Sequence, residues 1–587
     1  MINKTIKIAL LLIALTLNGK AQESNSKLNQ LFDQFYKESN ALDPMNATFN
    51  SVADYNDLLP ADDEEWLKKK HDFCINYLKQ LKGIDKKKLN KDEKISYEIL
   101  ESNLQSTLKI EKHHPEYMPI NQMFNVPMFM AVVGAGTSVQ PFKTVKDYDN
   151  WLKRCKAFTK WTDVAIDNMR KGIKTGIVLP KALVVKIIPQ FQELEKNSDE
   201  SSFYMPIKNF PESFTESDKN RLNNEFKQTI PNNVFVSMAK LSAFLQNEYL
   251  PKARLSSGIN SLPNGKEMYK DYILLSTTTN KDPEEVYKLG LSEVARITSE
   301  MEKIKTTIGF KGTLNEMFEF MKTDKQFMPF KSEKEVMDAY QTIYETIKPK
   351  LPTYFGIIPK TPFEVRKTES FRADAAPAQY LPGDLLSNRP GVFYIAIIDP
   401  TKVNTCNMDM ESLFLHEAIP GHHFQFSLQA ENTGFPEFRK KYMNSAYVEG
   451  WALYTESLGK DLGVYTTPYH QLGALGMEIH RAIRLVTDAG LHTGKMNRED
   501  AIKYIMDNEP LSEKDAISEI ERYMAMPGQA LSYKIGELKI KELRDKYKKQ
   551  LGDKFNLRDF HGAILVGGAM PLTVFESYMD NWAKSVK

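Results

Sequence analysis

The sequence is poor in cysteine, since its 587 residues contain only Cys74, Cys155 and Cys406. These three lie far apart and form no CxxC pair, so we expect no Cys-ligated metal and at most one disulfide. An excess of charge of one sign is also lacking, because 78 Lys and Arg residues nearly balance 76 Asp and Glu residues. A near-neutral chain has no electrostatic attraction to nucleic acid, and we expect no nucleic-acid partner.

Apolar runs long enough to cross a membrane are also lacking, and the N-terminal run from Ile8 to Leu17 is too short to span a bilayer comfortably. Lysines precede this run, and Gly19 and Ala21 follow it as the small residues that a signal peptidase accepts. We therefore expect residues 1–21 to be a signal peptide. No cysteine follows the run, so we expect no stable membrane anchor and a periplasmic or secreted protein that begins at Gln22.

A helical pattern runs through the N-terminal half, where apolar residues recur three and four positions apart, as in Leu28, Leu31 and Phe35. With 42% hydrophobic and 26% charged residues, the composition is that of a soluble globular protein. We expect a mainly α-helical, large, two-lobed fold. Residues 22–265 would form an N-terminal helical lobe and residues 266–587 a catalytic lobe, because Pro and Gly residues cluster at the boundary.

A short strand is expected between Gly391 and Ile398, where aromatic and β-branched residues follow a Pro-Gly turn. It would form a small β element beside the active-site helix. Its edge could pair with an extended peptide, which makes Tyr394 a candidate substrate-binding residue.

Three imidazoles and a carboxylate are concentrated in the segment HEAIPGHH, residues 416–423. Neutral imidazole is a preferred ligand of zinc, and Glu417, beside the first ligand His416, can accept a proton from a metal-bound water. In the common zincin helix the pattern is HExxH, whose spacing places both rings on one helix face. The segment therefore predicts zinc as the cofactor and Glu417 as the general base.

Pro420 and Gly421 interrupt that pattern. On a straight helix, His416 and His422 would point about 120° apart with about 9 Å of rise between them. A kink at the Pro-Gly pair can bring the second ring back. We favour His422 as the second ligand because the insert accounts for two surplus residues. His423 stays the alternative, since an offset of seven residues returns to nearly the same helix face.

A third ligand is expected from a later helix, and Glu449 lies in an apolar setting that includes Val448 and Trp451. A buried carboxylate is costly unless it is paired, and a metal ion would offset that cost. Glu456, two turns further on the same face, could orient a metal ligand. The alternative readings are a salt-bridged helix acid at Glu449 and a simple loop turn in the HEAIPGHH segment.

With these motifs, HEAIPGHHFQ at 416–425 and EGWA at 449–452, the sequence resembles the bacterial family called domain of unknown function 885. The likeness extends to RPGVFY at 389–394, to RAIRLVTDAGLH at 481–492 and to RYMAMPGQALSYKIG at 522–536, and so covers roughly the C-terminal half. That family is similar to the gluzincin peptidases, which hold zinc with two His and a distant Glu. The resemblance implies peptide hydrolysis and a peptide substrate.

A turn at 527–529 could present Tyr533 or Arg522 to a cleft. Tyr533 is our first choice as the donor that stabilises the oxyanion, in part because the chain resembles helical dipeptidyl carboxypeptidases with a late Tyr. Arg522 or Arg484 could bind a substrate carboxylate bidentately, although both residues and the tyrosines also fit an ordinary helix surface or core. The remaining candidates for substrate binding are Tyr523 and Gln529.

Two other functional classes fit the same motifs. One is a catalytically idle binding protein of the same fold, which the intact Glu417 disfavours because a binder needs no base. The other is a metal-dependent hydrolase of non-peptide amides or esters. The sequence does not distinguish an endopeptidase from an exopeptidase, and it does not predict the oligomeric state.

Overall fold

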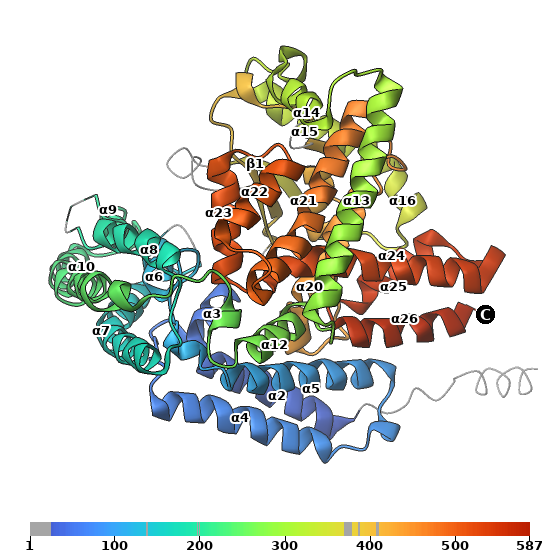
Figure 1. Ribbon diagram of the computed structural model, residues 1–587. Coiled ribbons are helices and arrows are strands. Elements are labelled where there is room, and N and C mark those ends of the chain that lie inside the picture. The colour runs from blue at the N-terminus through green and yellow to red at the C-terminus, as the bar shows by residue number, and fades with distance from the viewer. Residues whose placement is uncertain are drawn as a thin grey trace, which may run out of the picture.

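The computed structural model describes residues 25–136, 139–196, 198, 200–368, 378–385, 388–406 and 410–586. In this part of the chain the fold is mainly α-helical with one small mixed sheet, as the sequence predicts (Figure 1). The expected signal peptide lies outside the described residues. Across the described segments, no helix combines the length and the apolar character needed to cross a membrane.

Three long N-terminal helices lie side by side at one edge of the molecule (Figure 1). They are α2 (Ser26–Leu42), α4 (Glu64–Lys82) and α5 (Lys91–Glu111). The side chain of an Asn or Asp residue caps the first turn of each helix, since these short side chains satisfy free backbone N–H groups there. Cys74 is buried in α4, and none of the three cysteines, all of them buried, forms a disulfide.

A second group of helices builds a core of its own, centred on aromatic side chains such as Trp151 and Phe158. Its main helices are α6 (Val126–Gly134), α7 (Val145–Thr175), α8 (Lys181–Leu194), α10 (Glu216–Thr229) and α11 (Val236–Phe244). The largest core instead joins both ends of the chain, because Leu28 and Tyr77 belong to the same cluster as Trp451. This core contains residues from both sides of residue 265, and the division into two lobes at that residue stays a prediction.

The middle of the chain continues with helices that lead to the sheet. They are α12 (Gly265–Thr277), α13 (Pro283–Ile308), α14 (Leu314–Thr323), α15 (Glu333–Ile347) and α16 (Leu351–Tyr354). Asp282 caps α13, and Pro283 occupies its first turn, where a missing backbone N–H costs no hydrogen bond.

The three strands are β1 (Phe363–Lys367), β2 (Gln379–Leu381) and β3 (Gly391–Ile395), in the order β1-β3-β2. The predicted strand is therefore confirmed over β3. The expectation that it offers an edge to a peptide is wrong, because β3 pairs in parallel with β1 and antiparallel with β2.

The C-terminal third packs around α21, which runs beside α13 (Figure 1). Its α-helices are α17 (Met410–Glu417), α18 (His422–Glu431), α19 (Glu437–Lys440), α20 (Ser445–Glu456), α21 (Pro468–Thr493), α22 (Arg498–Asn508), α23 (Glu513–Ala525), α24 (Ser532–Leu551), α25 (Leu557–Gly567) and α26 (Leu572–Val586).

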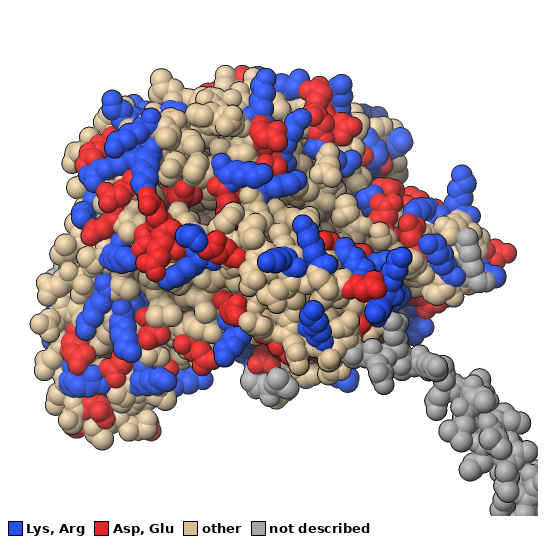
Figure 2. All heavy atoms as spheres, turned by 90° about the horizontal axis from the view of Figure 1, so that it is seen from below, with Lys and Arg blue, Asp and Glu red and all other residues tan. Residues whose placement is uncertain are grey.

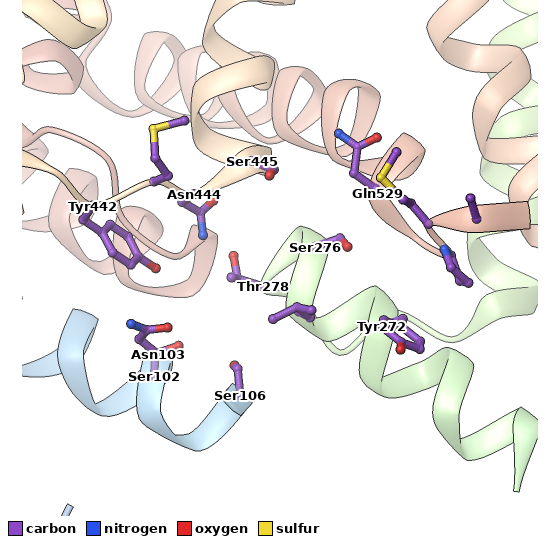
Figure 3. Close-up of a pocket in the computed structure, with 15 residues that line it drawn as sticks. Ser102, Asn103, Ser106, Tyr272, Ser276, Thr278, Tyr442, Asn444, Ser445 and Gln529 are labelled. Carbon is purple, nitrogen blue, oxygen red and sulfur yellow. The ribbon is translucent and has the colours of Figure 1, made fainter. Parts of the chain in front are cut away.

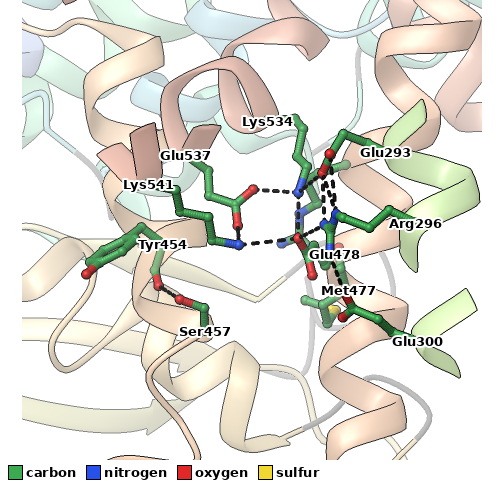
Figure 4. A network of polar contacts seen from close by, with 11 residues as sticks. Glu293, Arg296, Glu300, Tyr454, Ser457, Met477, Glu478, Lys534, Glu537 and Lys541 are labelled. Atoms are coloured by element: carbon green, nitrogen blue, oxygen red, sulfur yellow. Dashed lines mark hydrogen bonds and ion pairs between the residues drawn. The ribbon is translucent and has the colours of Figure 1, made fainter. Parts of the chain in front are cut away.

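An ion-pair cluster joins α13, α21 and α24 (Figure 4). The buried ammonium of Lys534 lies 2.6 Å from Glu478 and from Glu537, and 3.2 Å from Glu293. Arg296 adds a 2.6 Å contact to Glu478. Since each buried charge faces opposite charges, the cluster fixes the three helices relative to one another.

Charges of both signs are interspersed over the face of the molecule seen in Figure 2. This mixture agrees with the near-zero net charge of the whole sequence.

Candidate metal centre

The HEAIPGHH segment breaks into two helices, as the sequence predicts. The helix α17 ends at Glu417 and α18 begins at His422, with a tight turn between them. A Cβ on Gly421 would collide with the carbonyls of Leu415 and His416, so only glycine fits this turn. Trp451 of α20 donates from its indole N–H to the carbonyl of Pro420 at 3.0 Å, which ties the break to the EGWA segment.

The break brings His416 and His422 together. Their ring centroids lie 4.8 Å apart, and both rings point at Glu449 on α20. The distances from one carboxylate oxygen of Glu449 to the two Nε2 atoms are 3.4 Å for His416 and 3.6 Å for His422. Ligand atoms of His416, Glu417 and His422 also lie within 4.8 Å of one another, which makes this group a possible metal site.

Glu456 fixes the orientation of His416, because its carboxylate lies 2.7 Å from Nδ1 of that ring. Arg481 approaches the same carboxylate oxygen at 3.4 Å. Nε2 of the same ring faces Glu449, and a metal bound there would take the lone pair of Nε2 in place of its proton, while Nδ1 donates to Glu456. Burial opposes a charge on His416, but the carboxylates of Glu449 and Glu456 outweigh it and raise the pKa of His416 to about 9.

His423 lies on a different side from His422. Its Nδ1 is 2.9 Å from the hydroxyl of Tyr380 on β2, and its ring contacts Phe363 with centroids 5.0 Å apart. Of the two alternatives, the structure therefore brings His422 to Glu449 and directs His423 toward the sheet. Burial lowers the pKa of both rings to about 4, so both are neutral at physiological pH.

Glu417 projects beside the two rings and is only partly buried. Burial of its carboxyl group raises the pKa of Glu417 to about 7, whereas the charge on His416 and a backbone hydrogen bond from Tyr380 act in the opposite direction. A carboxyl group with a pKa near neutrality can both accept and donate a proton at physiological pH.

Tyr380 is a site residue that the sequence reasoning missed. A Cβ on Gly391 would collide with the Tyr380 hydroxyl and lie 2.8 Å from Nδ1 of His423, so this glycine makes room for the pair. The glycine of the RPG segment was therefore the available signal. The antiparallel pairing of β2 with β3, in which Tyr380 lies opposite Phe393, is what brings the Tyr380 hydroxyl to Gly391.

The position of Glu449 depends on a close helix crossing. A Cβ on Gly450 of α20 would lie 2.5 Å from the Cα of Gly536 on α24. Two glycines at this point let the helix backbones touch. Tyr533 lies one turn before this crossing on α24. The guanidinium of Arg484 on α21 lies 4.6 Å from the centre of the Tyr533 ring.

Arg484 is buried and already engaged. Its guanidinium donates to Glu519 at 3.1 Å and to the hydroxyl of Tyr523 at 3.2 Å. Burial raises the pKa of the Glu449 carboxyl group, but the contact with His416 and the charges of His422, His416 and, last, Arg484 outweigh it and lower that pKa to about 2. The structure thus places Arg484 near Glu449, and it places Tyr523 and Tyr533 against Arg484.

Arg522 and Gln529 form a pair further along this network. The guanidinium of Arg522 donates to the side-chain carbonyl of Gln529 at 2.7 Å and approaches Glu519 at 3.4 Å. The predicted turn at 527–529 is present between α23 and α24, where the Gly528 N–H donates to the buried carboxyl group of Asp488 at 3.1 Å.

Tyr394 does not face the His-Glu group. Side chains alternate along a strand, and its neighbour Phe393 packs against Phe414 of α17 with ring centroids 6.4 Å apart. Tyr394 therefore lies on the opposite face of the sheet, where it pairs with Arg366 of β1.

Comparisons with known proteins agree with this description. The family described as "Bacterial protein of unknown function (DUF885)" matches residues 44–579. A putative lipoprotein from Colwellia psychrerythraea is 26% identical, with a TM-score of 0.86 over 95% of this chain and 99% of that one. A putative lipoprotein of unknown function from Shewanella oneidensis is 19% identical and shares the fold, with a TM-score of 0.74 over 94% of this chain and 99% of that one. No curated protein matches.

Proposed function

The chain belongs to the DUF885 family of bacterial proteins, and on that premise we propose that it is an exported zinc-dependent peptidase. The observation that carries the proposal is the approach of the Nε2 atoms of His416 and His422 to one oxygen of Glu449, at 3.4 and 3.6 Å. Two imidazoles and a carboxylate form a ligand set that suits zinc.

The charges around the site support a bound cation. Glu417, Glu449 and Glu456 surround the imidazole of His416, and their charges raise its pKa. A divalent cation bound at this ring would replace the proton that these carboxylates hold on His416, and it would face the buried carboxylate of Glu449. When bound, zinc would polarise a scissile carbonyl and acidify the attacking water.

The residues of the chain then have separate tasks in peptide-bond hydrolysis. Glu417 accepts the proton of the attacking water at its carboxylate and passes it to the leaving amine, a role that its pKa of about 7 suits. Glu456 holds Nδ1 of His416. The Tyr533 hydroxyl donates to the carbonyl oxygen as negative charge develops there, and Arg484 below the Tyr533 ring holds it in place.

An exported location fits this activity. The two similar structures bear the name putative lipoprotein, which supports a location outside the cytoplasm. The first cysteine of this chain, Cys74, is buried in α4. We therefore propose release after Ala21 into the periplasm or the medium rather than lipid anchoring.

The test is digestion of a mixed oligopeptide pool, read by mass spectrometry, with and without a chelator. Glu417→Gln should keep its zinc and lose about 100- to 10,000-fold in turnover, the usual contribution of a general base. Glu437→Gln, a change at a surface acid, is the control and should cleave normally. Cleavage of esters or non-peptide amides without peptides would favour the alternative hydrolase, and zinc binding without any hydrolysis would favour a binding protein.

A further inference from the structure

A pocket of about 440 Å³ lies at the N-terminal end of α20 (Figure 3). Its wall combines α5, the C-terminal half of α12, the residues that lead into α20 and the turn before α24. Figure 3 shows these side chains converging from segments that are far apart in the sequence. The volume lies within the range of about 300–1,000 Å³ that is usual for ligand sites.

The wall of this pocket is uncharged. None of the described residues that line it is Asp, Glu, Lys or Arg, although such residues make up 26% of the chain. Its polar groups are hydroxyls and amides, among them Asn103 and Ser106 of α5, Tyr272 of α12 and Ser445 of α20. Leu275 and Met526 add apolar surface. A polar but neutral wall is unusual for a surface so rich in charge.

Several of these polar groups are available to a ligand. In the part of the chain that the structure describes, the side chains of Asn103, Ser106 and Ser445 make no hydrogen bond to protein. Gln529 accepts from Arg522 through its carbonyl oxygen, which leaves its amide donors for the pocket. Peptide groups and uncharged polar side chains supply the complementary donors and acceptors.

The pocket adjoins the His-Glu group along α20. Ser445 and Glu449 are four residues apart, and hence on the same face of the helix with about 6 Å of rise between them. A second connection runs through the carboxylate of Glu519. It contacts Arg522, which binds the pocket residue Gln529. It also contacts Arg484, whose charge acts on Glu449. A peptide held at the His-Glu group is therefore within reach of the pocket.

We propose that the pocket is a substrate subsite that accepts uncharged residues of a peptide and excludes Asp, Glu, Lys and Arg. The inference rests on the proposed peptidase activity. A charged side chain that enters the pocket loses hydration and finds no opposite charge in the wall, whereas Gln, Ser or Tyr can form hydrogen bonds there. The positive charge of Arg522 behind Gln529 is balanced by Glu519.

The experiment separates binding from cleavage by using zinc-loaded Glu417→Gln protein. Blocked alanine hexapeptides that carry one Gln, Lys or Glu, moved through every position, are titrated by calorimetry. At one position of the hexapeptide, the Gln peptide should bind at least about tenfold more tightly than the Lys and Glu peptides, because each of these two loses the hydration of one charge. Equal affinity for all three residues at every position would overturn the subsite.

A charge placed in the wall identifies this pocket as the source of the preference. Asn103→Asp should raise the affinity for the Lys peptide and lower that for the Glu peptide by severalfold. Gln105→Glu adds the same charge on the exposed side of α5, outside the pocket, and should change neither affinity. Identical effects of the two variants would contradict the proposal. Binding of an uncharged sugar in place of peptides, tested with chitotriose, would also contradict it.

The two proposals fail in different ways. If the wild-type protein cleaves peptides regardless of their charge, the proposed peptidase function stands and the proposed subsite fails. If the Glu417→Gln protein prefers the Gln peptide but the wild type cleaves none of the peptides, the subsite stands as a binding site and the proposed peptidase function fails.

Discussion

Gly450 of α20 and Gly536 of α24 touch through their backbones, so that a Cβ on Gly450 would lie 2.5 Å from the Cα of Gly536. Glu449, which faces His416 and His422, directly precedes this contact. The glycines of two separate sequence motifs, EGWA and YKIG, thus have one physical task. They let α20 approach α24 closely enough to hold Glu449 at the two rings.

Gly450→Ala should therefore force the two helices apart. We expect a loss of about 1–3 kcal/mol in the free energy of unfolding, typical of overpacking, together with weaker metal binding. Gly476→Ala is the matched control, because its Cβ meets nothing within 4 Å in the middle of α21. That variant should gain up to about 1 kcal/mol, since Ala favours a helix. Urea unfolding and metal analysis of both proteins test this, and equal stability would contradict it.

Local sequence chemistry predicted the break in the HEAIPGHH segment and the return of His422 to the side of His416. Pro420 and Gly421 act on their own backbone, and their effect on His422 follows from counting residues along a helix. An acid in an apolar helix needs a partner, and the structure places Glu449 beside both His residues, while its role as a metal ligand stays a prediction.

The sequence failed where the answer depended on tertiary pairing. Tyr380 reaches His423 only because β2 pairs with β3, and nothing in its own neighbourhood of the sequence marks it. Substrate binding by Tyr394 stays a prediction, but the structure places this residue on the face of the sheet away from the His-Glu group, because the elements packed against a strand decide which face meets the site. The participation of α2, α4 and α5 in the largest core is likewise a long-range result.

His422 and His423 should differ in their effect on the metal. His422→Ala removes a ring whose Nε2 faces Glu449, so zinc bound after dialysis should fall far below one equivalent. His423→Ala should retain zinc, but lose about 1–3 kcal/mol of stability because it leaves the buried Tyr380 hydroxyl without this partner. Inductively coupled plasma analysis measures the metal. A metal-free His423→Ala with a metal-loaded His422→Ala would reverse the assignment.

Glu456→Gln should weaken the metal site without abolishing it. The change removes the charge that orients His416 through Nδ1, and we expect about a 10- to 100-fold loss of zinc affinity. Asp271→Asn is a matched control, since Asp271 of α12 forms a similar 2.7 Å pair with the buried His113, which lies in the turn after α5. Competition with a fluorescent zinc chelator measures both affinities, and a similar loss in the two variants would show a general effect of stability.

Asp488 should make stability depend on pH. It is fully buried and accepts hydrogen bonds from Tyr269 and from the backbone of Gly528, at 2.6 and 3.1 Å. Burial outweighs these bonds and raises the pKa of Asp488 to about 7. The folded state therefore keeps a proton that the unfolded state loses near pH 4, so this group lowers the free energy of unfolding as pH rises from about 4 to 7.

Asp488→Asn removes this titration while its amide oxygen can still accept one of the two hydrogen bonds. We expect the variant to show a smaller fall in stability between about pH 5 and 7 than the wild type, by an amount on the order of 1–3 kcal/mol. Asp553→Asn, a change at an exposed acid, serves as the control and should follow the wild-type curve. Urea unfolding at a series of pH values gives all three curves. If Asp488→Asn also follows the wild type, then Asp488 is already ionised in the folded protein, and its hydrogen bonds rather than burial determine its charge.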